Sequence, residues 1–262
     1  MNGSLEYLGI KVEFYYEKEE ANKPILLFIH GFGDSMKTFL FPYKNIERKF
    51  RIAAINLPNE NHSDISLKLE DYEQIVKAFY NEHFSNEPAV YIASHSLGSY
   101  CALMLNQKEN VKKTFLFSPF NPFLLENRDV SVFRTWLEPQ NLEQLRQSYI
   151  HFFYDKNNPL IVKTISLLKD RDWSKRTKVL GKMINEQILN ENFLKNNVFN
   201  LFKTAKDIFI ISGNKDEYTK KEGIINISNE LKIPLILFEN KGHAIFFEAK
   251  NECLNFINEH IK

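Results

Sequence analysis

Ser94-His95-Ser96-Leu97-Gly98 lies where an apolar, strand-like run over residues 88–93 gives way to a helix-like run over residues 100–107. A serine at such a strand-to-helix corner takes a strained backbone conformation that holds its hydroxyl away from the chain. Small residues two positions before and two after it let the strand and the helix approach each other. Ser94 stands where the G-x-S-x-G pattern has its first glycine. The stretch predicts a nucleophilic serine at position 96, although an ordinary turn can have the same spacing.

Strand-like and helix-like runs alternate along most of the chain. A hairpin is predicted over residues 5–16. We predict strands over residues 25–29, 51–57, 89–93, 114–118, 207–212 and 234–238, and helices over residues 69–83, 97–107, 221–231 and 249–261. Strands that alternate with helices favour an α/β fold, in which helices cover both faces of a mostly parallel central sheet.

The interval 121–206 breaks this alternation because its pattern is helical and dense in aromatic residues. These are Phe123, Phe133, Trp136, Tyr149, Phe152, Phe153, Tyr154, Trp173 and Phe193. We interpret the interval as a helical cap inserted into a core made of residues 1–120 and 207–262. Most of the aromatic side chains are expected to form the core of the cap, and a minority to line a pocket. The charged stretch 169–178 is interpreted as a solvated face.

Composition argues against several classes of partner. The 262-residue chain has 34 basic and 33 acidic side chains, so its bulk charge does not favour nucleic acid or an anionic membrane surface. A small-molecule partner is expected instead. No basic segment followed by an apolar stretch marks the N-terminus, and no run of about 18 apolar residues occurs. We therefore expect a cytoplasmic protein without stable membrane insertion, and leave its oligomeric state open.

No cofactor and no metal are expected from the motifs. Cys101 and Cys253 are far apart, which indicates neither a disulfide framework nor a zinc site. The chain has no H-E-x-x-H zinc motif and no G-x-x-x-x-G-K-[ST] phosphate loop, and Gly31-Phe32-Gly33 lacks the third glycine of a dinucleotide loop.

Partners for a nucleophilic serine occur at the ends of other predicted strands. Asp216 follows the strand 207–212, and His243 follows the strand 234–238. The carboxyl ends of parallel strands share one edge of a sheet, so Ser96, Asp216 and His243 are predicted to meet there as nucleophile, orienting acid and base. Glu217 and Asp207 are alternative acids.

Two backbone N–H groups are predicted to form an oxyanion hole. They belong to Phe32, in the glycine-containing loop after the strand 25–29, and to Leu97, which follows the serine. The other histidines, His30, His62 and His95, are interpreted as structural. His30 is expected to brace its loop through hydrogen bonds, and His95 to pack beside the serine.

Four motifs together resemble those of the α/β-hydrolase family, in particular its capped, esterase- and lipase-like members. They are H-G-F-G-D at 30–34, S-H-S-L-G at 94–98, G-x-x-D ending at Asp216, and G-H ending at His243. The resemblance implies a cap between the sixth and seventh core strands. It also implies hydrolysis of a small carboxylic ester through an acyl-enzyme on Ser96. The aromatic cap favours an apolar substrate.

One segment departs from the family pattern. Residues 56–63 resemble the family's D-x-P-G-x-G-x-S segment but have Asn56, Asn59 and Asn61 in place of its aspartate and glycines. The missing glycines put the usual tight turn of that segment in question, although asparagine tolerates the left-handed conformation better than most residues.

Two other functions stay open: cleavage of a thioester, an amide or a carbon–carbon bond by the same triad, and a catalytically silent protein that binds a ligand.

Overall fold

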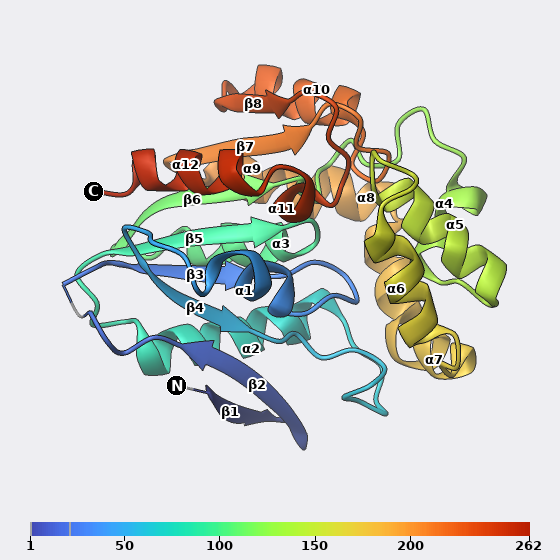
Figure 1. Ribbon diagram of the computed structural model, residues 1–262, viewed down its shortest axis with the longest axis horizontal. Coiled ribbons are helices and arrows are strands. Elements are labelled where there is room, and N and C mark those ends of the chain that lie inside the picture. Colours follow the sequence, from blue (N-terminus) through green and yellow to red (C-terminus); the bar gives the residue numbers. More distant parts are fainter. Residues whose placement is uncertain (1, 21) are drawn as a thin grey trace.

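A mostly parallel sheet organises the protein. The computed structural model describes residues 2–20 and 22–262. In this part of the chain eight strands form one sheet in the order β1-β2-β4-β3-β5-β6-β7-β8, with helices on both faces (Figure 1). The β1–β2 and β2–β4 pairs are antiparallel, and every later pair of neighbours is parallel. The predicted fold class is confirmed.

The element bounds are as follows. The strands are β1 (Asn2–Tyr7), β2 (Ile10–Tyr16), β3 (Ile25–Ile29), β4 (Arg51–Ile55), β5 (Val90–His95), β6 (Val111–Phe117), β7 (Ile208–Gly213) and β8 (Leu235–Phe238). The helices of the sheet layers are α1 (Lys37–Tyr43), α2 (Leu69–His83), α3 (Gly98–Leu105), α10 (Lys221–Leu231), α11 (Ile245–Glu248) and α12 (Lys250–His260). Between β6 and β7 lie α4 (Val130–Leu137), α5 (Leu142–Phe152), α6 (Pro159–Leu168), α7 (Trp173–Met183), α8 (Glu191–Phe193) and α9 (Phe199–Thr204), with π-helical stretches η1 (Ile184–Ile188) and η2 (Leu194–Val198).

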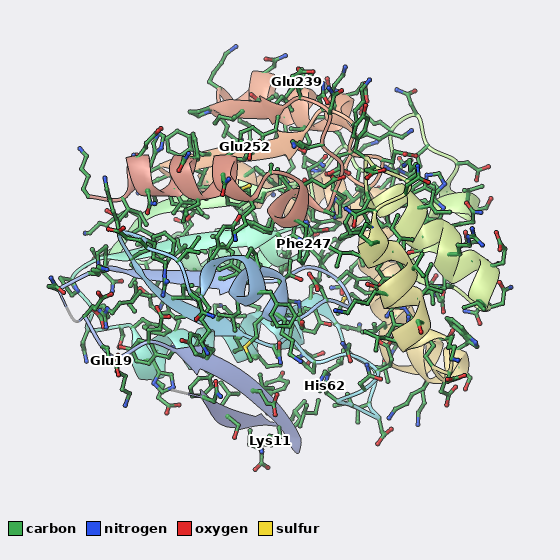
Figure 2. The ribbon with its side chains drawn as sticks, viewed as in Figure 1. Lys11, Glu19, His62, Glu239, Phe247 and Glu252 are labelled. Carbon is green, nitrogen blue, oxygen red and sulfur yellow. The ribbon has the colours of Figure 1, made fainter. Side chains whose placement is uncertain are left out.

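The central strands are buried on both faces, which explains their continuous apolar sequences. In β3, Ile25, Leu27 and Ile29 enter one hydrophobic cluster, while Leu26 and Phe28 enter the other. Helices α2, α3 and α10 cover the first cluster, and α1, α11 and α12 cover the second. Charged side chains such as Glu19 and Glu239 lie exposed at the periphery (Figure 2).

Long elements agree with the sequence predictions better than short ones. The strand 25–29 and the helices 69–83 and 221–231 have the predicted bounds. The strand predicted to end at residue 93 continues to His95, which pairs with Phe117. Helices α1 and α11 were not predicted, because seven and four residues are too few to show a helical period.

The helices between β6 and β7 lie beyond the carboxyl ends of the strands for most of their length (Figure 1). This edge is where the segments after β3, β5, β7 and β8 also emerge. None of the helices in the described part of the chain is both long and apolar enough to cross a bilayer.

Ser94 tests how tightly β5 is packed. It is fully buried between Ile29 of β3 and Leu116 of β6, and its hydroxyl has no hydrogen-bond partner among the described residues. Replacing Ser94 with alanine removes an unpaired buried hydroxyl, so we expect the free energy of unfolding to rise by about 1 kcal/mol. Ser94→Gly should be tolerated, whereas Ser94→Leu should cost about 1–3 kcal/mol through overpacking. Urea denaturation measures all three, and a loss in Ser94→Ala as large as that in Ser94→Leu would contradict this view.

Candidate active site

Ser96 occupies the sharp turn between β5 and α3. Its backbone φ is 50°, in the left-handed region that non-glycine residues rarely adopt. A Cβ atom at Gly98 would lie 2.4 Å from the carbonyl oxygen of Ile29 and 2.5 Å from that of His30. Glycine at 98 therefore allows α3 to start directly against β3. Within residues 94–98 Ser96 is the one partly exposed residue.

The loop after β3 lies against this serine. A hydrogen bond from Asp34 N to Gly31 O (3.3 Å) closes a turn in which Gly33 has a φ of 64°. A Cβ atom at Gly31 would approach Ser96 Cβ to 3.0 Å. In the described part of the chain the N–H groups of Phe32 and Leu97 have no acceptor. Both predicted oxyanion-hole donors thus flank the serine with their hydrogen-bonding capacity unused.

Asp216 and His243 form a buried hydrogen-bonded pair. His243 Nδ1 lies 2.8 Å from Asp216 Oδ2. A carboxylate only accepts, so Nδ1 carries the hydrogen and Nε2 is left as an acceptor. Asp216 Oδ1 also accepts from the N–H groups of Tyr218 (2.8 Å) and Thr219 (2.9 Å). Burial raises the pKa of Asp216, but the interaction with His243 and the hydrogen bonds from His243, the Thr219 N–H and Ser118 outweigh it and hold the pKa well below its ordinary value.

The two alternative acids have other surroundings. Glu217 bonds His151 Nδ1 and Lys156 Nζ, each at 2.5 Å. Asp207 precedes β7 and so lies at the opposite end of that strand from the His243 loop. Of the three acids, Asp216 is therefore the one that contacts His243.

The remaining histidines of these segments brace the site. His30 donates from Nδ1 to Gly31 O and accepts the Leu57 N–H at Nε2, both at 2.8 Å, as a loop-bracing residue does. His95 donates from Nε2 to the carbonyl oxygen of His243 at 2.9 Å, and the two rings lie 4.7 Å apart. Tyr218, which sequence reasoning missed, stacks on the His243 ring at 4.9 Å. The base is therefore fixed from its backbone and from its ring face.

The asparagine-containing loop at residues 56–63 still makes a turn. Asn59 Oδ1 accepts the Asn61 N–H at 2.9 Å, and the Asn59 carbonyl accepts the N–H groups of His62 (2.9 Å) and Ser63 (3.1 Å). Neither Asn59 nor Asn61 has a positive φ. A turn therefore forms without the glycines and without a left-handed asparagine, because the Asn59 side chain bonds the backbone two residues on.

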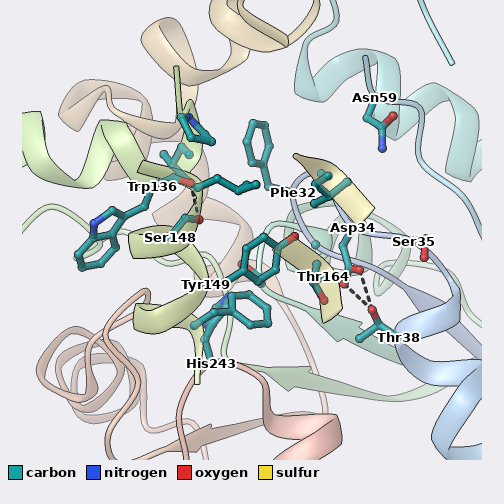
Figure 3. A pocket seen from close by; sticks show the side chains of 18 of the residues that line it. Phe32, Asp34, Ser35, Thr38, Asn59, Trp136, Ser148, Tyr149, Thr164 and His243 are labelled. Carbon is teal, nitrogen blue, oxygen red and sulfur yellow. Dashed lines mark hydrogen bonds between the residues drawn. The ribbon is translucent and has the colours of Figure 1, made fainter. Parts of the chain in front are cut away.

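A cavity of about 390 Å³ opens beside Ser96 and His243. This volume suits a small organic molecule. Phe32 lines it from the loop after β3 (Figure 3), and four of the nine aromatic residues singled out in the interval 121–206 line it as well. These four are Trp136, Tyr149, Phe152 and Phe153. Among the described residues no group of three or more His, Cys, Asp or Glu side chains is arranged to hold a metal ion.

The charged stretch 169–178 is not simply a solvated face. Lys178 is exposed, but Arg176 is buried and bonds Glu60, and Arg171 also pairs with Glu60. Glu60, Arg171 and Arg176 all line the cavity. The prediction is wrong here because Arg176 shares one helix face with Val179 and Met183, three and seven residues on, and that apolar spacing was the missed signal.

The buried His95 should make folding sensitive to acid. Burial, followed by the charge of His243, lowers the pKa of His95 to about 3, whereas an unfolded histidine titrates near 6.5. The unfolded chain therefore gains a proton first, so this contribution to stability is complete above pH 6.5 and is lost as the pH falls toward 3. We expect His95→Gln to reduce the stability loss between pH 7.5 and 5.5 by about 1.4 kcal/mol. Urea denaturation at both pH values measures it, and an unchanged loss would contradict the buried neutral imidazole.

Comparison with known proteins places this geometry in a family context. A family model described as alpha/beta hydrolase fold matches residues 24–250. A Mycoplasma pneumoniae protein described as an esterase/lipase is 29% identical over 111 residues. That alignment spans 40% of this chain and 41% of the relative, so it covers about two fifths of the relative's length.

Two solved structures show the same fold at low sequence identity. A membrane phospholipase A, described as a bacterial virulence factor, is 17% identical with a TM-score of 0.77, over 99% of this chain and 84% of that one. The 2-hydroxy-6-oxo-6-phenylhexa-2,4-dienoate hydrolase of Rhodococcus sp. strain RHA1 is 14% identical with a TM-score of 0.77, over 99% of this chain and 98% of that one.

Proposed function

Because this chain belongs to the α/β-hydrolase fold family, we propose that it is a serine hydrolase that cleaves a carboxylic ester of a small substrate through an acyl-enzyme intermediate. The observation that carries the proposal is the buried Asp216–His243 hydrogen bond at the cavity into which Ser96 opens. Each of these residues follows a different parallel strand at the same edge of the sheet.

In the proposed reaction, Ser96 Oγ attacks the ester carbonyl while His243 Nε2 takes the hydroxyl proton. Asp216 holds the imidazole through Nδ1–H and stabilises the imidazolium. The N–H groups of Phe32 and Leu97 donate to the oxyanion. His243 then protonates the leaving alcohol, and a water molecule, deprotonated by His243, releases the acid from Ser96.

We assign the interval 121–206 as a cap over the core of residues 1–120 and 207–262. Its support is that the interval lies between β6 and β7 and supplies four of the aromatic residues that line the cavity. Such a lining excludes water and favours an apolar stretch of substrate. The same triad can act on thioesters, amides or carbon–carbon bonds, because the pocket more than the triad selects the chemistry. A panel of these substrates separates the reactions.

Removal of the nucleophile is the first test. Ser96→Ala should lower kcat/KM for short p-nitrophenyl esters by at least about 10³-fold, since no acyl-enzyme can form. Ser94→Ala is the matched control, because it deletes a nearby serine hydroxyl that has no partner. Retention of the wild-type rate by Ser96→Ala would assign the nucleophile elsewhere.

Neutralising the acid is the second test. Asp216→Asn should lower kcat about 10⁴-fold, because an amide cannot hold His243 in the Nδ1–H tautomer or stabilise its charged form. Glu217→Gln, the neighbouring acid that bonds His151 and Lys156, should keep most of the activity. If Glu217→Gln were the inactive variant, the acid assignment would be reversed.

A further inference from the structure

The cavity beside Ser96 is lined by charged side chains that the proposed reaction does not use. Among the described residues that line the cavity, four are lysine or arginine and two are aspartate or glutamate: Lys37, Lys163, Arg171, Arg176, Asp34 and Glu60. The lining therefore has an excess of positive charge, although the chain as a whole is nearly neutral.

In this lining one carboxylate faces two guanidinium groups, and we call these three residues, Glu60, Arg171 and Arg176, the charged wall. Arg176 Nη1 lies 2.9 Å from Glu60 Oε1 and 3.0 Å from Oε2. Arg171 Nη2 also contacts Glu60 Oε1. The side chains of Glu60 and Arg176 are 4% and 8% exposed, and that of Arg171 is 13% exposed. A single carboxylate cannot neutralise both cations, so Glu60, Arg171 and Arg176 together have a net charge of +1 in a largely dehydrated place. The buried Glu138 also acts on Arg176, but it is itself paired with Arg134.

Arg176 is built into the scaffold. Its Nε donates to the carbonyl oxygen of Leu137 at 2.8 Å, and its guanidinium lies 4.9 Å from the centroid of the Phe32 ring. A Cβ atom at Gly33 would lie 3.0 Å from two of its nitrogens. Arg176 therefore joins the α7 segment to the loop that holds the predicted oxyanion donor, and it places the charged wall beside that loop.

Arg171 has donors left over. Its Nε is buried and has no acceptor within the described residues. Burial, together with the neighbouring Arg176 charge, lowers the pKa of Arg171 to about 10. The guanidinium stays charged at neutral pH but lacks the second anion that its planar fork of donors is suited to bind.

We propose that this wall binds an anionic group, a carboxylate or a phosphate, on the same substrate that carries the ester bond. The inference rests on the proposed function and narrows its substrate class. Trp136, Phe152 and Leu145 line the cavity as well, and they suit an apolar part of the substrate. The substrate is then a partly apolar ester that also carries an anion.

A pair of matched esters tests the charge preference. Mono-p-nitrophenyl suberate ends in a carboxylate, and p-nitrophenyl methyl suberate has the same chain with a neutral end. The wild-type protein should have at least a tenfold higher kcat/KM for the anionic ester, mainly through KM, and this preference should shrink between 50 mM and 500 mM salt. Equal kcat/KM values, or a preference for the neutral ester, would overturn the proposal. The 6-phosphonooxyhexanoate p-nitrophenyl ester, compared with its neutral hexanoate analogue, shows whether phosphate replaces carboxylate.

Arg171 is the residue to change, since Arg176 also holds the scaffold. Arg171→Gln should remove the preference for the anionic ester and leave kcat/KM for the neutral ester within about twofold of wild type. Arg171→Lys keeps the charge and should restore part of the preference, which also guards against an unstable glutamine variant. Lys178→Gln removes a cation of α7 that does not line the cavity. It should change neither the preference for the anionic ester nor kcat/KM for the neutral ester. A preference that survives in a folded Arg171→Gln protein would contradict the assignment.

Binding without turnover separates this inference from the proposed function. Suberate should bind the Ser96→Ala protein in calorimetric titrations, at least tenfold more weakly when Arg171→Gln is added. If Ser96 is needed for hydrolysis but suberate does not bind and no anion preference exists, the inference is wrong and the hydrolase assignment stands. If suberate binds through Arg171 and no ester is cleaved, the anion site stands and the hydrolase assignment is wrong.

Discussion

The contact between Gly98 and the end of β3 is the constraint on which the site depends. No Cβ atom fits at Gly98, because the carbonyl oxygens of Ile29 and His30 would lie 2.4 and 2.5 Å from it. With glycine there, α3 begins against β3, and the turn before it holds Ser96 at a φ of 50°. A Cβ atom at Gly31 would likewise lie only 3.0 Å from Ser96 Cβ, so the loop after β3 borders the serine. One missing side chain thus positions both the serine and the predicted oxyanion donors.

A buried carboxylate is the second constraint, because an isolated charge at Asp216 would be costly. His243 and two backbone N–H groups satisfy it, which links β7 and β8 at their carboxyl ends. The base is held further by His95, which donates to the carbonyl of His243, and by the Ala244 N–H, which donates to Phe152 O at 3.0 Å. The orientation of His243 is therefore coupled to β5 and to the helices between β6 and β7.

Much of the fold followed from the sequence, because strands buried on both faces read as continuous apolar runs and long helices show their period. Order along the chain also predicted that Asp216 and His243 would meet, since parallel strands end at one edge. The Glu60–Arg176 pair was beyond such reasoning, because 116 residues separate its partners and no local pattern links them. Arg176 alone was within reach from the apolar spacing of α7. Ser96, Asp216, His243, Phe32 and Leu97 remain predictions in their catalytic roles, which geometry supports and chemistry has to test.

The central claim is that Ser96 is an activated nucleophile. Treatment of the folded protein with a fluorophosphonate, followed by peptide mass spectrometry, tests it most directly. Such reagents phosphonylate a serine efficiently only where a base and an oxyanion hole assist the attack. The account predicts one phosphonyl adduct, on the peptide that contains residues 94–98 and at Ser96, with labelling abolished by unfolding. An unlabelled folded protein, or an adduct on a different serine, would contradict it.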